Sequence, residues 1–189
     1  MAQMTQANLP RRIIKETQRL ISDPPCGIIA VPTETNLRYF KVVMQGPPQT
    51  CYDGGTFKLE LVLPEDYPAV PPKVRFLTKV YHPNIDKMGR ISLDTLRTRW
   101  TPAMHIRMLL LSIQRLLGYP MGEDAWNQSA ARAWMDDEAR AICTAREWTH
   151  NSCTQPDSPI SMSCIWTCCV SCNDISKKTF LRHSLPSIL

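Results

Sequence analysis

Three patterns in the sequence predict a single α+β domain. Residues 10–21 and 106–118 carry apolar side chains at helical spacing, whereas residues 56–63 alternate between apolar and polar side chains. Helical spacing is typical of amphipathic helices, and the alternation is typical of a strand with one buried face. Helices on both sides of a run of strands favour an α+β fold. With 189 residues and 43% hydrophobic content, the chain has room for one packed domain and a tail.

The N-terminal helix is expected to run to Ile21, with Asn8 as its N-cap and Pro10 in its first turn. Such a helix packs one side against the domain and shows a basic side to the solvent. The residues of the packed side are Ile13, Thr17, Leu20 and Ile21. The cations that lie largely off this side are Arg11, Arg12, Lys15 and Arg19.

Three or four extended segments follow this helix. They are Ile28–Val31, Arg38–Gln45, Thr56–Leu63 and Lys73–Phe76. Their connections are short, with Gly54 and Gly55 just before the third, and this favours an antiparallel meander. The connection between the last two segments, LPEDYPAVPP, holds four prolines and is predicted to be a rigid loop.

A long irregular stretch from Leu77 to His105 separates the sheet from the next helix. A loop of this length in a compact domain is commonly functional. The next helix is expected to end at Gly118, because glycine is a typical helix stop. Two further helices are expected at Trp126–Trp134 and Asp137–Thr149. The chain is therefore divided into a disordered extension at 1–8, a core domain at 9–150 and a divergent tail at 151–189.

Charge and hydropathy argue against two kinds of partner. The net charge of +5 is spread along the chain, with a local basic cluster only on the N-terminal helix, so no nucleic acid is expected. No uncharged apolar run reaches about 18 residues, so no membrane span is expected. The starting segment MAQMTQANLPRR is polar and then basic, unlike a signal peptide. These features predict a cytoplasmic and nuclear protein.

The cysteines concentrate at the C-terminal end of the chain. Five of the eight lie in the last 39 residues, where Ser is also frequent. The spacing of Cys164, Cys168, Cys169 and Cys172 is not a standard zinc spacing and lacks a second ligand pair at a distance. No metal ion and no cofactor are therefore expected. The composition predicts a mostly disordered extension, and a binding module that acts through these cysteines is the alternative.

Several collinear blocks carry a resemblance to a known family. RRIIKETQRL (residues 11–20), GGTFKLEL (54–61), PKVRF (72–76) and YHPNIDKMGRI (81–91) resemble ubiquitin-conjugating enzymes. The likeness extends over residues 9–149 and is strongest to the branch that builds lysine-sixty-three-linked chains with an inactive variant partner. It implies the ubiquitin-conjugating (UBC) fold: an N-terminal helix, a four-stranded antiparallel meander, a long active-site loop and C-terminal helices.

The resemblance places the catalytic site of the loop at Ser92. In the family, a cysteine eight residues after the Asn of His-Pro-Asn carries ubiquitin as a thioester, and Ser92 holds that position here. A thiol is nucleophilic near neutral pH, whereas a hydroxyl needs an adjacent base. His82, Asp86 and Asp94 are the nearby candidates for a base, although the family uses the His mainly to brace the loop. An oxyester at Ser92 reacts with lysine more slowly than a thioester, so transfer is expected to be blocked or very slow.

Two further residues match the family's active site. The resemblance gives Asn84 the role of a hydrogen-bond donor to the oxyanion that develops during transfer. The alternative is that its amide pins the loop backbone, as Asn often does in turns. Asp124 matches an acid that orients the incoming lysine, and on the residues alone it is a helix cap or a solvated acid. Ala125 stands where the family has a proline, and Trp126 is unusual for the family.

Partner-binding residues are implied by the same resemblance. The positions that contact the ubiquitin-activating enzyme and RING-type ubiquitin ligases are Arg11, Arg12 and Lys15, which would otherwise be a solvated basic face. Further ligase contacts are implied at Ala69, Thr101 and Pro102. Contacts with the conjugating-enzyme variant, a heterodimer partner, are implied at Glu60, Val62 and Arg75. Ala69 replaces a Met and Val62 an aromatic anchor, so both interfaces are expected to be weaker.

Three hypotheses about function follow. The leading one is a ubiquitin-conjugating-enzyme-like protein of the ubiquitin pathway that lacks normal thioester transfer, a pseudoenzyme that still binds ubiquitin or pathway partners. The second is an active conjugating enzyme in which Ser92 is a Cys-to-Ser trap or the working nucleophile. The third is the binding module in the tail.

Overall fold

The computed structural model describes residues 9–121 and 125–153 of the chain. The predicted N-cap Asn8, the predicted acid Asp124 and the cysteine cluster of the tail lie outside these residues. Within the described ranges, no helix is long and apolar enough to cross a membrane. The elements follow in the order α1 (Arg11–Ser22), β1 (Ile28–Pro32), β2 (Tyr39–Gln45), β3 (Thr56–Val62), β4 (Lys73–Phe76), the 3₁₀ turn η2 (Asp94–Leu96), α2 (Ile106–Gly118), α3 (Gln128–Asp136) and α4 (Glu138–Cys153).

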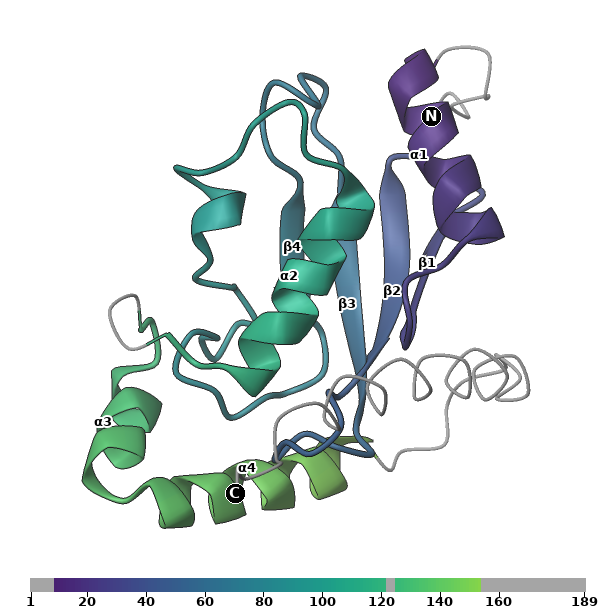
Figure 1. The fold of residues 1–189 in the computed structure, drawn as a ribbon. Coiled ribbons are helices and arrows are strands. Elements are labelled where there is room, and N and C mark those ends of the chain that lie inside the picture. Colours follow the sequence, from purple (N-terminus) through teal and green to yellow (C-terminus); the bar gives the residue numbers. More distant parts are fainter. Residues whose placement is uncertain (1–8, 122–124, 154–189) are drawn as a thin grey trace, which may run out of the picture. The chain divides into compact units, whose positions relative to one another are not determined.

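The predicted α+β fold with an antiparallel meander is confirmed. Four strands form one sheet in the order β1-β2-β3-β4, each antiparallel to the next (Figure 1). The observed strands agree with the predicted ones to within one residue at each end. In β3, the buried residues Phe57, Leu59 and Leu61 alternate with partly exposed ones, because successive side chains of a strand point to opposite faces. One face of the sheet therefore supplies the core.

Helix α2 covers the core from the other side. In Figure 1 it lies in front of the sheet, and it spans the predicted residues up to Gly118. Its apolar residues enter the same buried cluster as Phe40 and Phe57 of the sheet. Those residues are Ile106, Leu109, Leu110, Ile113, Leu116 and Leu117. The long loop before α2 thus runs between the sheet and a firmly packed helix.

The buried side of α1 differs from the predicted one. Glu16 is buried between Ile13 and Leu20, whereas Ile21 is 61% exposed and its predicted burial was wrong. Positions 13, 16 and 20 follow the spacing of one narrow helix face, from which position 21 is turned by about 100°. Pro10 is the N-cap of α1, so the predicted N-cap at Asn8 was wrong and Pro10 precedes the helix instead of lying in its first turn. The Pro10 carbonyl accepts a hydrogen bond from the Ile13 N–H.

The last two helices begin or end later than predicted. α3 begins at Gln128 because Asn127 caps it, with a side-chain oxygen that accepts a hydrogen bond from the Ala130 N–H. α4 continues to Cys153 instead of ending at Thr149. Cys153 is partly buried and packs against the core, so the helical packing extends past the expected end.

Candidate active-site loop

A tight turn at Gly89 shapes the loop between β4 and α2. Gly89 has a φ of +79°, and a Cβ there would lie 1.9 Å from the Phe76 carbonyl oxygen, so only glycine fits. The Asp86 carboxylate accepts hydrogen bonds from the Met88 N–H (2.9 Å) and the Arg90 N–H (2.8 Å). Burial raises the pKa of Asp86, but the bonds from Arg90 and Met88 outweigh it and lower this pKa below its ordinary value. Asp86 therefore stays ionised and closes the turn.

His82 is fully buried, and both nitrogens of its ring are engaged. Nδ1 accepts a hydrogen bond from the Asn84 N–H at 2.9 Å, so Nε2 carries the proton and donates a hydrogen bond to the Leu116 carbonyl at 3.0 Å. Burial lowers the pKa of His82 to about 4, although the Leu116 bond acts in the opposite direction. The ring is therefore neutral near pH 7 and ties the loop to α2.

The Asn84 side chain joins the loop to the segment that follows α2. Its Nδ2 donates to the Met121 carbonyl at 2.7 Å, and its Oδ1 accepts from the Met121 N–H at 2.8 Å. The Asn84 carbonyl also accepts a hydrogen bond from the Ser92 N–H at 2.8 Å. Asn84 is fully buried, so these bonds fix its amide in place. Pairing with a peptide group is a structural use of the amide.

Ser92 is 1% exposed, and its three candidate bases have other partners. Both ring nitrogens of His82 are bound to the backbone of Leu116 and Asn84. Asp86 forms an ion pair with Arg90, and the Asp94 carboxylate lies 3.4 Å from Nε of Arg99. Across 9–121 and 125–153, none of the three forms a hydrogen bond with the Ser92 hydroxyl. The loop therefore lacks the Ser-His-Asp arrangement that activates a serine in hydrolases.

Trp126 lies against two arginines of the loop. The guanidinium carbon of Arg97 is 4.1 Å from the centroid of the indole ring, and that of Arg90 is 5.5 Å from it. The next residue, Asn127, donates its backbone N–H to the Pro83 carbonyl at 2.9 Å. These contacts hold the start of α3 on the loop. The sequence marks Trp126 as unusual but does not reveal its arginine partners, because spacing within one segment does not show contacts between distant segments.

Hydrogen bonds connect the three segments predicted to contact ubiquitin ligases. Arg12 Nη2 donates to the Met104 carbonyl at 2.8 Å, and Trp100 Nε1 donates to the Pro68 carbonyl at 2.8 Å. They link α1, the proline-rich loop and the segment before α2 into one face. The predicted contact residues that this face exposes are Arg11, Lys15, Ala69, Thr101 and Pro102.

The residues predicted to contact the variant partner lie across β3 and β4. Glu60 and Arg75 are register partners and form an ion pair, and Tyr39 donates its hydroxyl to Glu60 at 2.7 Å. The bond from Arg75 lowers the pKa of Glu60. Val62 lies two residues further on the same face of β3, and the three line a groove of about 560 Å³ with the proline-rich loop and Trp126.

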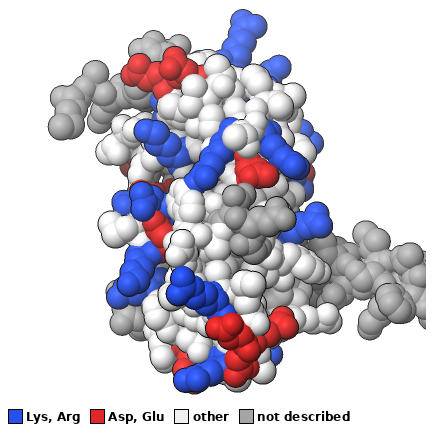
Figure 2. Space-filling view, turned by 90° about the vertical axis from the view of Figure 1, so that its left-hand side faces the viewer, with Lys and Arg blue, Asp and Glu red and all other residues white. Residues whose placement is uncertain are grey.

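Charges and potential metal ligands are dispersed over this part of the molecule. On the face that Figure 2 shows, Lys and Arg are separated by acidic and uncharged residues and form no continuous basic surface. A basic patch or stripe is the surface that nucleic-acid-binding proteins present. The described residues include no group of three or more His, Cys, Asp or Glu that could hold a metal ion.

Comparisons with known proteins agree with this fold. A family model for "Ubiquitin-conjugating enzyme" matches residues 12–149. Ubiquitin-conjugating enzyme E2 N of Macaca fascicularis is 59% identical over 143 residues, which cover 76% of this chain and 94% of the relative. Ubiquitin-conjugating enzyme E2 13 of Schizosaccharomyces pombe is 58% identical over 141 residues, with 75% and 95% covered. The Saccharomyces cerevisiae protein of the same name is 57% identical over 143 residues, with 76% and 94% covered.

Proposed function

We propose that this chain, which belongs to the family of ubiquitin-conjugating enzymes, has lost normal thioester transfer or is strongly impaired in it. The chain is a ubiquitin-conjugating-enzyme-like protein of the ubiquitin pathway. The observation that carries the proposal is the residue at position 92. The resemblance requires a cysteine eight residues after Asn84, and the sequence has Ser92.

The surroundings of Ser92 support this proposal chemically. A serine hydroxyl becomes a useful nucleophile only when a neighbouring base removes its proton. His82, the nearest histidine in the sequence, has one nitrogen donating to Leu116 and the other accepting from Asn84, and burial lowers its pKa to about 4. The carboxylates of Asp86 and Asp94 pair with arginines. Attack by the hydroxyl on an activated ubiquitin therefore lacks a general base.

The hydrogen bonds of the Asn84 side chain favour a structural role for this residue over a role in ubiquitin transfer. Both its oxygen and its nitrogen are bound to the Met121 peptide, so the side chain holds two segments together. We expect Asn84→Ala to lower the stability of the domain by about 1–3 kcal/mol, because it removes both hydrogen bonds between the buried amide and the Met121 peptide. Urea denaturation measures this loss. A change below about 0.5 kcal/mol would contradict the structural role.

A loading assay tests the proposal directly. The full chain is incubated with ubiquitin-activating enzyme, ATP and ubiquitin, and non-reducing gels are run with and without thiol and with mild base. We expect no thiol-sensitive adduct on residue 92. A thiol-resistant, base-labile adduct would show loading of Ser92 and support the alternative of an ester carrier. Free ubiquitin chains made by the unmodified chain would refute the proposal.

Two variants make this assay specific for position 92. Ser92→Cys is expected to gain a thiol-sensitive adduct, because it restores the missing nucleophile. Ser92→Ala keeps all eight native cysteines, so any adduct that persists in this variant arises elsewhere in the chain. Identical adducts in all three proteins would mean that position 92 does not control loading.

The partner faces belong to the same proposal. We infer that the face around Arg12 and Ala69 contacts the activating enzyme and RING-type ligases, and that the groove at Val62 takes the variant partner. Ala69 is exposed and Val62 partly so, and both positions lack the larger apolar side chain that the resemblance implies. Restoring an anchor commonly returns a few kcal/mol, so Val62→Phe is expected to tighten variant binding by tenfold or more. Calorimetric titration with the variant measures this, and unchanged affinity would exclude the groove as the interface.

A further inference from the structure

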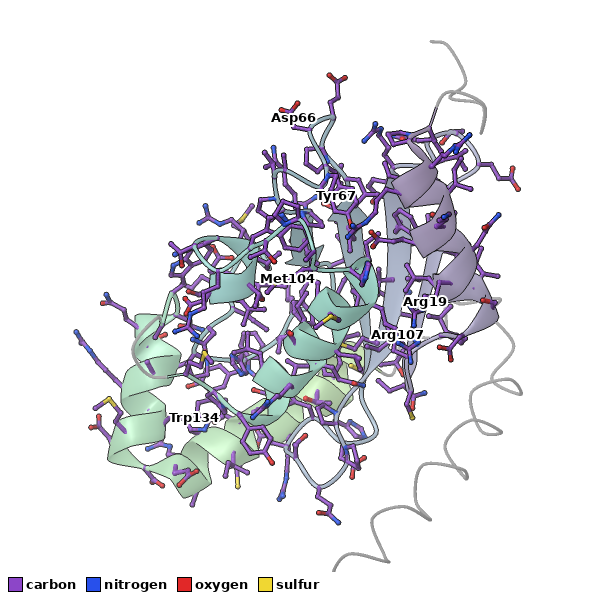
Figure 3. All side chains as sticks on the ribbon, turned by 45° about the horizontal axis from the view of Figure 1, so that its top comes forward. Arg19, Asp66, Tyr67, Met104, Arg107 and Trp134 are labelled. Carbon is purple, nitrogen blue, oxygen red and sulfur yellow. The ribbon has the colours of Figure 1, made fainter. Side chains whose placement is uncertain are left out.

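A groove between α1 and α2 gathers cations outside the active-site loop. Its volume is about 420 Å³, and we call it the α1–α2 groove. Lys15 and Arg19 line it from α1, and Arg107 lines it from α2. Figure 3 shows Arg19 and Arg107 side by side between the two helices. Grooves of about 300–1,000 Å³ are typical of sites for small molecules.

The acid inside this groove is already saturated by other partners. Glu16 is 7% exposed and accepts hydrogen bonds from the Tyr67 hydroxyl at 2.9 Å and from the Ile106 N–H at 2.8 Å. It also forms an ion pair with Arg12. Glu16 therefore does not neutralise the cations at the mouth of the groove.

Two of the cations that line the groove, Lys15 and Arg19, are available for a ligand. Lys15 and Arg19 are four residues apart on one helix, so their side chains are neighbours. Within the described residues neither forms an ion pair with a carboxylate. Asp23 holds Arg107 through an ion pair at 3.3 Å and a hydrogen bond to the Asp23 carbonyl, so Lys15 and Arg19 are the cations left for a ligand. The groove keeps a positive charge that no acidic side chain offsets.

Leu20 and Met108 add apolar surface to the groove, and His105 completes its lining. Leu20 is 3% exposed and forms part of its floor, whereas Met108 is 55% exposed and forms a wall. An exposed methionine next to cations suits a molecule with both an anionic and an apolar part. A phosphate group has oxygens enough to accept from Lys15 and Arg19 together.

We propose that the α1–α2 groove binds a small phosphate-bearing molecule. Its phosphate accepts hydrogen bonds from Lys15 and Arg19, and its uncharged part contacts Leu20 and Met108. This site is separate from Ser92, and its existence does not depend on the loss of thioester transfer. Lys15 also belongs to the face predicted for the activating enzyme, so the ligand and that partner compete for one cation.

Titrations of the ¹⁵N-labelled full chain with two probes test this inference. Pyrophosphate supplies the phosphate alone, and AMP adds a planar body. We expect both to shift amide signals of α1 and α2 and AMP to bind more tightly. Arg19→Gln is expected to weaken both probes by about tenfold, the loss typical of one charge-assisted hydrogen bond. Met108→Ser is expected to weaken AMP but not pyrophosphate.

The matched control is Arg132→Gln, which removes an exposed arginine from α3 and is expected to leave both affinities unchanged. All of these side chains are exposed, so the variants should fold, and their amide spectra report this directly. No shifts at millimolar probe would overturn the inference. Equal losses of probe affinity in Arg19→Gln and Arg132→Gln would also overturn it. The same holds if sulfate binds as tightly as pyrophosphate. Equal weakening of both probes by Met108→Ser would refute the apolar contact.

Discussion

Replacing Glu16 with alanine is expected to destabilise the domain by about 4 kcal/mol. Glu16 is 7% exposed and accepts hydrogen bonds from Tyr67 and from the backbone of Ile106, both of which are buried. Its removal leaves these two donors unsatisfied, and each such group costs about 1–3 kcal/mol. Arg12 also loses its ion pair, but its side chain is 32% exposed and can turn to water. For a chain of this size the loss corresponds to a fall in Tm of about 8–16 °C.

Urea denaturation of the full chain measures this free energy. Glu16→Gln keeps the shape and one acceptor oxygen, so about half of the loss is expected. Gln18→Ala, an exposed position on the same helix, serves as the control and should change stability by no more than about 0.5 kcal/mol. Tyr67→Phe completes a double-mutant cycle with Glu16→Ala, with an expected coupling of about 1–2 kcal/mol. A loss below about 1 kcal/mol for Glu16→Ala, or no coupling, would refute the reasoning.

Three further predictions concern the loop. Burial lowers the pKa of His82 from 6.5 to about 4, so between these values the unfolded chain binds a proton that the folded chain does not, and stability falls by up to about 3 kcal/mol as the pH drops. Denaturation at a series of pH values should show this slope in the native chain and a smaller one in His82→Gln; equal slopes would contradict it. Thr95 Oγ1 is buried and has no partner within the described ranges, so Thr95→Val should raise the free energy of unfolding by about 1 kcal/mol, whereas Thr95→Ser should not. Trp126→Ala and Arg97→Ala should show a coupling of about 0.5–1 kcal/mol in a double-mutant cycle, and additive losses would mean that their stacking adds no stability.

Local patterns in the sequence predicted most of the fold because they depend on neighbours along the chain. The alternation around Leu59 and the helical stripe around Ile113 each describe one face of one element. Glu16 was missed because its role depends on distant residues: Tyr67 lies 51 positions away and Ile106 lies 90 away. A periodic pattern that expects apolar residues on the buried side cannot identify an acid that caps another helix.

The site shows the same division between local spacing and distant contacts. The eight-residue spacing from Asn84 identified Ser92, but the partners of Asn84 and Trp126 come from other segments. Met121 is 37 positions from Asn84, and Arg97 approaches Trp126 only in the folded chain. Whether the Asn84 amide and the Trp126 indole have structural roles depends on these contacts. They could not be derived from residue types alone, because many pairs of distant segments are compatible with the same sequence.

The way Ser92 is held determines how a Ser92→Cys experiment should be interpreted. Its hydrogen bond to the loop uses the backbone N–H, which donates to the Asn84 carbonyl at 2.8 Å, and hydrogen bonds to Leu116 and Met121 fix His82 and Asn84. Exchanging one side-chain oxygen for sulfur leaves all of these bonds in place. A Ser92→Cys chain that still fails to form a thioester would therefore not indicate a broken loop. The failure would have to arise where partners dock, and restoring the larger side chain at Ala69 or Val62 would then be the next step that separates the two faces.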